Sequence, residues 1–186
     1  MRSLRGISAC LILACVGAGW AEQPTVRVPA EGWQVVSFDE VSAVRADSVG
    51  ASVAVAGSSR WARLAFVAHL PDPAPRGRAS NARQAERAVA EAEKILTLVA
   101  RELRAQAGGL PQDLRIAVVG GGFGADDFRA IVARKAAELL HASPDSVWTA
   151  GGGPRVYSVS VSARGDILLK QQPPDAGPRP LLPSGA

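Results

Sequence analysis

The side chains that most often carry catalysis are few in this sequence, and their spacing points to no common reaction. The only two histidines, His69 and His141, do not show the spacing of a metal-ligand pair. No G-x-S-x-G turn marks a serine nucleophile. Aspartates and glutamates are scattered, so no pair of carboxylates stands out for acid–base catalysis. The sequence therefore predicts a protein that is not an enzyme and binds no metal.

A glycine-rich segment in the second half of the chain is the one motif that suggests a cofactor. Gly120, Gly122 and Ala125 satisfy the G-x-G-x-x-G/A pattern of dinucleotide-binding folds, between an expected strand and an expected helix. However, Asp126 and Asp127 would place negative charge at the helix end where a pyrophosphate must lie. Too little chain remains for the second half of such a fold. We interpret the segment as a glycine-rich turn and expect no cofactor.

The N-terminus has the organisation of a secretory signal peptide. Arg2 and Arg5 give it a positive start, and residues 7–19 form an uncharged apolar run that is too short for a stable membrane anchor. Small residues ahead of the cleavage position predict a cut after Ala21, which would leave a mature chain in the periplasm. The alternative is a lipoprotein box that ends at Cys15 and would leave this cysteine lipidated at the new N-terminus.

Cysteine content and charge exclude several classes of partner and chemistry. Cys10 and Cys15 both lie in the expected signal, so the exported chain should have neither a disulfide nor a thiol nucleophile. Of the formal net charge of +4, two charges belong to Arg2 and Arg5. Because the remainder has no dense basic run and few aromatic side chains, we expect no nucleic-acid partner.

The elements that would have to position a site are mostly strands. Apolar, β-branched or aromatic residues alternate or cluster between turn residues in six segments: 32–38, 60–70, 114–119, 147–149, 156–161 and 167–170. Arg164, Gly165 and Asp166 form an expected hairpin turn between the last two. Residues 39–59 keep neither a period of 2 nor one of 3.6 and stay ambiguous.

Two segments predict helices. Residues 81–106 open with Asn81 as a capping residue and Gln84 three positions later. Their apolar positions then recur at spacings of three and four: Ala85, Ala88, Ala92, Ile95, Val99 and Leu103. Asp126 and Asp127 open a second helix that runs through residue 140. The organisation is thus a signal peptide over residues 1–21, a single domain over 22–170 and a proline-rich disordered tail over 171–186.

Five segments, taken in order, resemble the OmpA-like domain, the peptidoglycan-binding module of bacterial envelopes. Residues 36–43 are similar to its opening strand with the F-D-x-x-S-A signature, and residues 64–72 to the second strand with its G-H-T-D end. Residues 81–88 are similar to the start of its long helix, residues 122–124 to the G-Y-G after the third strand, and residues 154–159 to the R-R-V-x-I strand. No single motif is intact: an alanine replaces the glycine before His69, and the threonine after it is missing.

The resemblance implies an α+β two-layer sandwich, with a mixed sheet, two to three helices on one face and the order β-α-β-α-β-α-β. It also implies a ligand, the zwitterionic diaminopimelate of a peptidoglycan stem. Asp72 would then hold the ammonium and Arg87 the carboxylate, with Asn81 and His69 beside them. Arginine suits this role because its fork matches a planar carboxylate.

On this basis we expect an exported envelope protein, associated with the outer membrane, that binds peptidoglycan and tethers a partner to the cell wall. The alternative is a protein–protein module with the same fold and no glycan site. It would be an accessory subunit of an envelope-spanning secretion, pilus or conjugation machine. No transmembrane span is expected after cleavage.

Overall fold

A computed structural model of the chain describes residues 23–71, 82–121, 126–151 and 155–172. Asp72 and Asn81, together with Gly122 and Ala125 of the glycine-rich pattern, lie outside these ranges. The described part contains nine strands, two α-helices and one short 3-10 helix. In chain order they are β1 (Thr25–Val28), β2 (Trp33–Ser37), β3 (Ala43–Val49), β4 (Val53–Ser59), β5 (Leu64–Leu70), α1 (Ala82–Ala107), β6 (Arg115–Gly120), α2 (Asp126–Leu139), η1 (Pro144–Ser146), β7 (Val147–Ala150), β8 (Tyr157–Ser162) and β9 (Ile167–Gln171).

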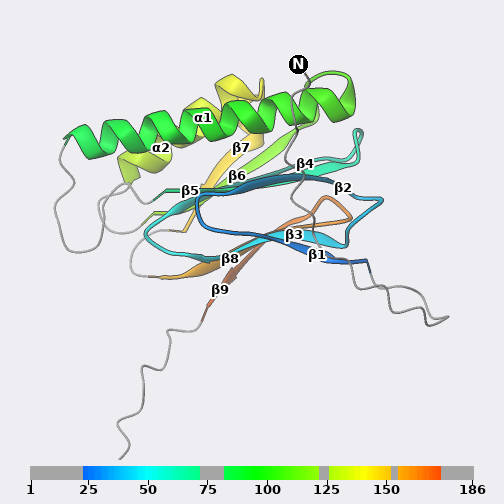
Figure 1. The fold of residues 1–186 in the computed structure, drawn as a ribbon, viewed down its shortest axis with the longest axis horizontal. Helices are drawn as coiled ribbons and strands as arrows, with labels where there is room; N and C mark the ends of the chain where they lie inside the picture. Colours follow the sequence, from blue (N-terminus) through cyan, green and yellow to red (C-terminus); the bar gives the residue numbers. More distant parts are fainter. Residues whose placement is uncertain (1–22, 72–81, 122–125, 152–154, 173–186) are drawn as a thin grey trace, which may run out of the picture.

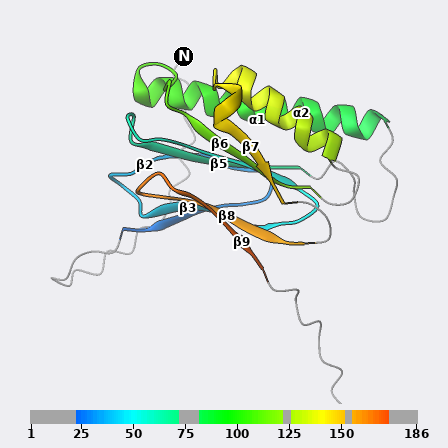
Figure 2. The ribbon, with the colours of Figure 1, turned by 180° about the vertical axis from the view of Figure 1, so that it is seen from behind.

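The strands form two separate sheets. The larger sheet has the order β2-β5-β4-β6-β7, antiparallel except for the parallel pair β6 and β7. The smaller sheet has the order β1-β3-β8-β9, in which only β1 and β3 are parallel. Both helices cover one face of the larger sheet, and the smaller sheet packs on its other face (Figure 1). Seen from behind, the same three layers follow one another: helices, larger sheet, smaller sheet (Figure 2).

The larger sheet is therefore the middle layer, and its central strands are buried on both faces. Every residue of β4 and β5 is buried. Because successive side chains of a strand point to opposite faces, Leu64 and Phe66 enter the core under the helices, whereas Ala65 and Val67 enter the core between the sheets. Each core contributes to stability at roughly 25 cal/mol per Å² of apolar surface removed from water.

Helix α1 confirms the sequence prediction almost to the residue. The predicted contact face is buried and lies in the core under the helices, namely Ala88, Ala92, Ile95, Val99 and Leu103. The helix ends at Ala107, and the next residue, Gly108, has φ +71°, the left-handed conformation that commonly terminates helices. The second helix also begins at Asp126 as predicted and ends one residue earlier than expected.

The expected two-layer OmpA-like order is not what the chain adopts. The α+β class, the mixed sheet and the placement of helices on one face are confirmed, but the described residues form nine strands in two sheets with two helices. The difference comes largely from residues 39–59, which contain β3 and β4. Because β4 is buried on both faces and apolar at each position from Val53 to Ala56, it has no alternation that would identify it as a strand. No helix in the described part of the chain is long and apolar enough to cross a membrane.

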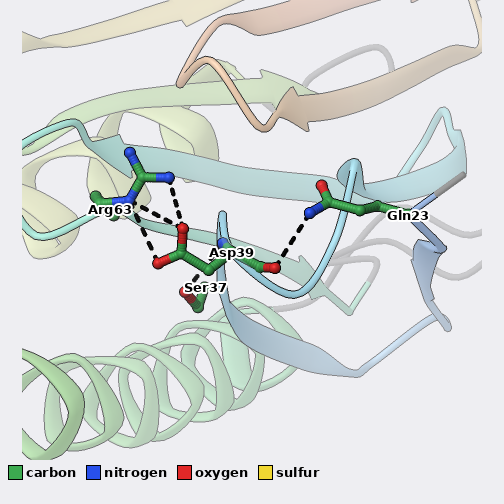
Figure 3. Close-up of polar contacts among 4 residues, drawn as sticks. All are labelled: Gln23, Ser37, Asp39 and Arg63. Atoms are coloured by element: carbon green, nitrogen blue, oxygen red, sulfur yellow. Dashed lines mark hydrogen bonds and ion pairs between the residues drawn. The ribbon is translucent and has the colours of Figure 1, made fainter. Parts of the chain in front are cut away.

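Polar contacts fasten the turn between β4 and β5 to the end of β2 (Figure 3). Nη2 of Arg63 lies 2.6 Å from Oδ1 of Asp39, and this side-chain bond lowers the pKa of Asp39 below 3.8. The backbone N–H of Asp39 donates to Oγ of Ser37, and Gln23 donates its side-chain amide to the carbonyl of Asp39. The N–H of Phe38 donates to the carbonyl of Arg63 over 2.9 Å, which extends the pairing of β2 and β5 by one bond.

Candidate functional site

The hairpin of β4 and β5 brings a serine and a histidine together. Ala54 is paired with His69 across the hairpin, so their side chains share the face toward the smaller sheet. Ser52 lies two residues before Ala54 and reaches the same face, diagonally opposite His69. The side-chain oxygen Oγ of Ser52 lies 2.7 Å from Nε2 of His69, a hydrogen bond. A hydroxyl that contacts an imidazole nitrogen is the arrangement of an activated serine nucleophile and its base.

The imidazole of His69 is held in an apolar setting. Its ring and main chain are 4% exposed, and its backbone N–H donates to the carbonyl of Gly32 over 2.8 Å. Burial lowers the pKa of His69 below its ordinary value of 6.5, because the charged ring would lose its hydration. The imidazole is therefore neutral at pH 7. Its other nitrogen, Nδ1, is buried and has no hydrogen-bond partner among the described residues.

The Ser52–His69 pair lines a hollow with a volume of about 460 Å³. The walls are built from the end of β1 and the segment after it, from the end of β3, and from the pair itself: Arg27, Val28, Pro29, Ala30, Asp47, Ser48, Ser52 and His69. Arg27 is exposed, so the hollow carries a cation on its wall. A volume of this size suits a small molecule or one side chain of a larger substrate.

A bulge in β3 contributes Asp47 and Ser48 to this wall. The register with β8 shifts between Ala46 and Val49, and Ser48 has φ +57°, a left-handed conformation that is uncommon for a residue with a side chain. Oδ1 of Asp47 accepts a hydrogen bond from Nε of Arg45 over 2.5 Å. Strained backbone of this kind concentrates at functional sites, where the surrounding structure holds it in place.

Glycines at the end of β6 pack directly against the backbone of Ser52. The N–H of Gly121 donates to the carbonyl oxygen of Ser52 over 3.0 Å. Gly120 has φ +96°, and a Cβ on it would lie 2.5 Å from the same oxygen. These two glycines therefore let the end of β6 approach the backbone of Ser52 more closely than residues with side chains would allow.

Of the four residues predicted for glycan binding, the structure describes His69 and Arg87 and does not bring them together. Asp72 and Asn81 belong to the undescribed segment between β5 and α1. Arg87 is exposed on α1, above one face of the larger sheet, whereas His69 points to the opposite face. The structure thus brings His69 to Ser52 and not to Arg87.

The sequence prediction missed Ser52 because its partner is 17 residues away and is reached only across a hairpin. A signal was present: once 53–59 and 64–70 are paired as strands, alternation alone places Ser52 and His69 on the same face. Without that pairing, Ser52 is one of many serines in a segment rich in alanine and valine.

No protein-family model and no curated protein matches this chain. Among solved structures, the chain is similar to the crystal structure of Bacillus licheniformis hypothetical protein YfiH, with a TM-score of 0.37 and 11% sequence identity. The alignment covers 59% of this chain and 50% of that one, so it spans only half the length of the solved protein. A likeness at this level assigns neither a family nor a function.

The prediction that the chain is not an enzyme is wrong, because the reasons given for it overlooked a contact between two side chains. That prediction rested on the spacing of the two histidines, the missing G-x-S-x-G turn and the scattered carboxylates, whereas the structure places Oγ of Ser52 within hydrogen-bond distance of the His69 imidazole beside a hollow. The absence of a G-x-S-x-G motif excluded one fold family only, because the same grouping of side chains recurs on unrelated folds in different sequence orders.

Proposed function

We propose that the protein is a hydrolase in which Ser52 is the nucleophile and His69 the general base, acting on an ester or amide. One observation carries this proposal: the 2.7 Å contact between Oγ of Ser52 and Nε2 of His69 at the wall of the hollow. Serine hydroxyls are weak nucleophiles unless an adjacent base accepts their proton. A buried imidazole with a lowered pKa can supply that base, because in the tautomer that carries its proton on Nδ1 the lone pair of Nε2 faces Oγ of Ser52.

The reaction follows from these two groups. Oγ of Ser52 bonds to the carbonyl carbon of the substrate while its proton passes to Nε2 of His69. The bond from that carbon to the leaving oxygen or nitrogen breaks, and the leaving group takes the proton from Nε2. An acyl group then remains on Ser52. Water attacks this acyl group, gives a proton to Nε2 and releases the acid, after which the proton returns to Ser52.

The hollow selects which carbonyl compounds reach Ser52. Val28, Pro29 and Ala30 give it an apolar side, and Arg27 and Asp47 add one charge of each sign. Asp47 is already bonded to Arg45, so the exposed Arg27 is the charge most available to a substrate. The proposed substrate is therefore a small acyl group, or one side chain of a protein, attached through an ester or amide bond.

Turnover of p-nitrophenyl acetate tests this proposal. Ser52→Ala should reduce the rate to the background that exposed imidazoles supply, and His69→Gln should reduce it by roughly 10²- to 10⁴-fold, the usual contribution of a general base. Exposed imidazoles also cleave this ester, so His141→Gln, which removes the exposed histidine, is the control and should retain the wild-type rate. Equal loss in the His141 variant, or full activity in the Ser52 variant, would exclude the proposal.

Peptidoglycan binding by an exported protein remains our second candidate, and one contact favours it. Glu91, the residue that could have neutralised Arg87 one helical turn away, lies 3.2 Å from Lys94 instead. The side chain of Arg87 is exposed and therefore accessible to an anionic ligand near the start of α1. Pull-down on insoluble sacculi tests this function: Asp72→Ala and Arg87→Ala should each weaken binding, and Arg83→Ala is the control. If wild-type protein does not bind sacculi, the protein–protein module takes the place of the glycan-binding function.

A further inference from the structure

Three backbone segments meet behind Ser52, and glycines make their contact close. The first contains Ser52, whose carbonyl oxygen accepts a hydrogen bond from the N–H of Gly121. The second is the end of β6 at Gly120, and the third is Gly151, which follows β7 and has φ +81°. A Cβ on Gly151 would lie 3.1 Å from the backbone nitrogen of Gly120. The position of Ser52 thus depends on how the ends of two parallel strands are held.

One side chain holds both strand ends. Nη1 of Arg129, on α2, donates to the carbonyl of Gly120 over 2.9 Å and to the carbonyl of Gly151 over 2.8 Å. Hydrogen bonds from a charged donor are shorter and stronger than those between neutral groups. The guanidinium therefore joins β6 to the segment that follows β7 at the level of the glycines.

We propose that Arg129 is a positioning residue for the nucleophile Ser52. The carbonyl of Gly120 and the N–H of Gly121 belong to one peptide unit. By bonding to this carbonyl, Arg129 restrains the N–H that donates to the carbonyl of Ser52. The inference rests on the proposed hydrolase function, because its consequence is the alignment of Oγ with Nε2 of His69. The alignment has little tolerance, since a displacement of about 1 Å can reduce the rate of a catalysed step by about 10²-fold.

The same α2 offers a matched control. Arg134 is exposed on this helix and lies a little more than one turn after Arg129. Arg134→Gln removes the same charge from the same helix without touching the glycines. Arg129→Lys keeps the charge and a nitrogen that can donate to both carbonyls, but on a shorter side chain, so it should fall between the wild type and Arg129→Gln.

Two measurements on the full-length protein test the inference. The first is the rate at which a fluorophosphonate probe labels Ser52, with the turnover of p-nitrophenyl acetate resolved into kcat and KM. Arg129→Gln should lower the labelling rate and kcat by about 10- to 100-fold with little change in KM, and Arg134→Gln should leave them unchanged. A general loss of folding would instead lower the melting temperature of the variant below the assay temperature.

The second measurement is amide hydrogen exchange at Gly121, which does not require activity. Arg129→Gln should increase the exchange rate of this N–H about tenfold or more relative to wild type, because the bond to Ser52 is loosened. Arg134→Gln should not. Unchanged exchange at Gly121 in Arg129→Gln would overturn the inference whether or not the protein is a hydrolase. If exchange increases but wild-type protein is not labelled at Ser52, the hydrolase function fails while the link from Arg129 to Ser52 stands.

Discussion

Ser52 Oγ and His69 Nε2 lie 2.7 Å apart on the face of the β4–β5 hairpin that looks toward the smaller sheet. The two strands are central to the larger sheet and buried throughout, so the hairpin is a rigid support for both side chains. Strands hold side-chain geometry better than loops do; His69 is on β5, and Ser52 is the residue directly before β4. The location of the pair at the end of the inter-sheet core explains how the imidazole is dehydrated while Ser52 still borders a hollow.

The pH dependence of Ser52 labelling should show the lowered pKa of His69. Burial is the cause of this shift, so the imidazole stays an unprotonated base below pH 6.5, the ordinary midpoint. Labelling by a fluorophosphonate should therefore fall only at a pH below 6.5, with a single apparent pKa. A midpoint at or above 6.5 would mean that the base is solvated or is not His69.

The His69 imidazole should also make folding stability depend on pH, and the direction of this dependence follows from its lowered pKa. The pKa of His69 is lower in the folded than in the unfolded chain, so the unfolded state binds the proton first as pH falls below about 6.5. Wild-type protein should then lose stability toward acid, by at most about 1.4 kcal/mol per pH unit for one proton. Urea unfolding of wild type and His69→Gln at several pH values measures this. The difference in the free energy of unfolding between the two proteins should change with pH below 6.5 and be constant above pH 7.5. A constant difference over the whole range would contradict the lowered pKa of His69.

Substitution of Gly120 should damage both stability and labelling. Alanine there would bring a Cβ to 2.5 Å from the carbonyl oxygen of Ser52 and would have to adopt φ +96°. Strain of this kind costs about 1–3 kcal/mol, and relief of the clash would displace Ser52. Gly109→Ala is the control, because a Cβ at Gly109 meets nothing within 4 Å. Chemical unfolding and probe labelling of both variants give the comparison, and similar behaviour of the two would show that the close approach at Gly120 is unimportant.

Asp113 should matter more for stability than its place in a loop suggests. Its carboxylate accepts hydrogen bonds from Oγ of Ser59 at 2.5 Å and from the backbone N–H groups of Arg60 and Trp61 at 2.9 and 3.0 Å. Burial acts to raise the pKa of Asp113, but these hydrogen bonds outweigh it and leave the pKa below 3.8. Asp113→Ala should therefore destabilise the protein by about 1–3 kcal/mol at pH 7, since it leaves these donors unpaired.

The contribution of Asp113 should disappear as the pH falls through its lowered pKa, because the protonated carboxyl is a weaker acceptor. Urea unfolding at pH 7 and at a series of decreasing pH values below 3.8 measures both effects. Asp39→Ala, which removes an exposed ion pair near the same turn, is the comparison and should change stability little. A loss for Asp113→Ala no larger than that for Asp39→Ala would contradict this account of the turn.

The parts of the fold that sequence predicts well are those with a clear period. Helix α1 was expected over 81–106 and occupies Ala82–Ala107, because its apolar residues recur at helical spacing on one face. The hairpin turn at Gly165 was likewise expected from turn residues between alternating segments, and Gly165 has φ +79° there. Strand β4 was not predicted because burial on both faces removes alternation, and without its pairing to β5 the contact of Ser52 with His69 could not be predicted either.

Other features of the site have no local signature. The bulge that turns Asp47 and Ser48 into the hollow depends on the register with β8, which lies more than a hundred residues away. The bonds from Arg129 to two glycine carbonyls likewise need the packing of α2 over the ends of β6 and β7. The glycines at 120 and 121 were interpreted as a turn, whereas in the structure they also make room for the backbone of Ser52.

The most direct test of the proposed hydrolase is the location of a covalent adduct. Full-length protein treated with a fluorophosphonate, digested and analysed by peptide mass spectrometry should carry one adduct, on Ser52. The adduct should be absent from heat-denatured protein, and His69→Gln should slow its formation by about 10²-fold or more. Ser160, which is partly exposed on β8 and has no base beside it in the described structure, should stay unmodified. An adduct spread over several serines, or none on Ser52 in the native protein, would contradict the account.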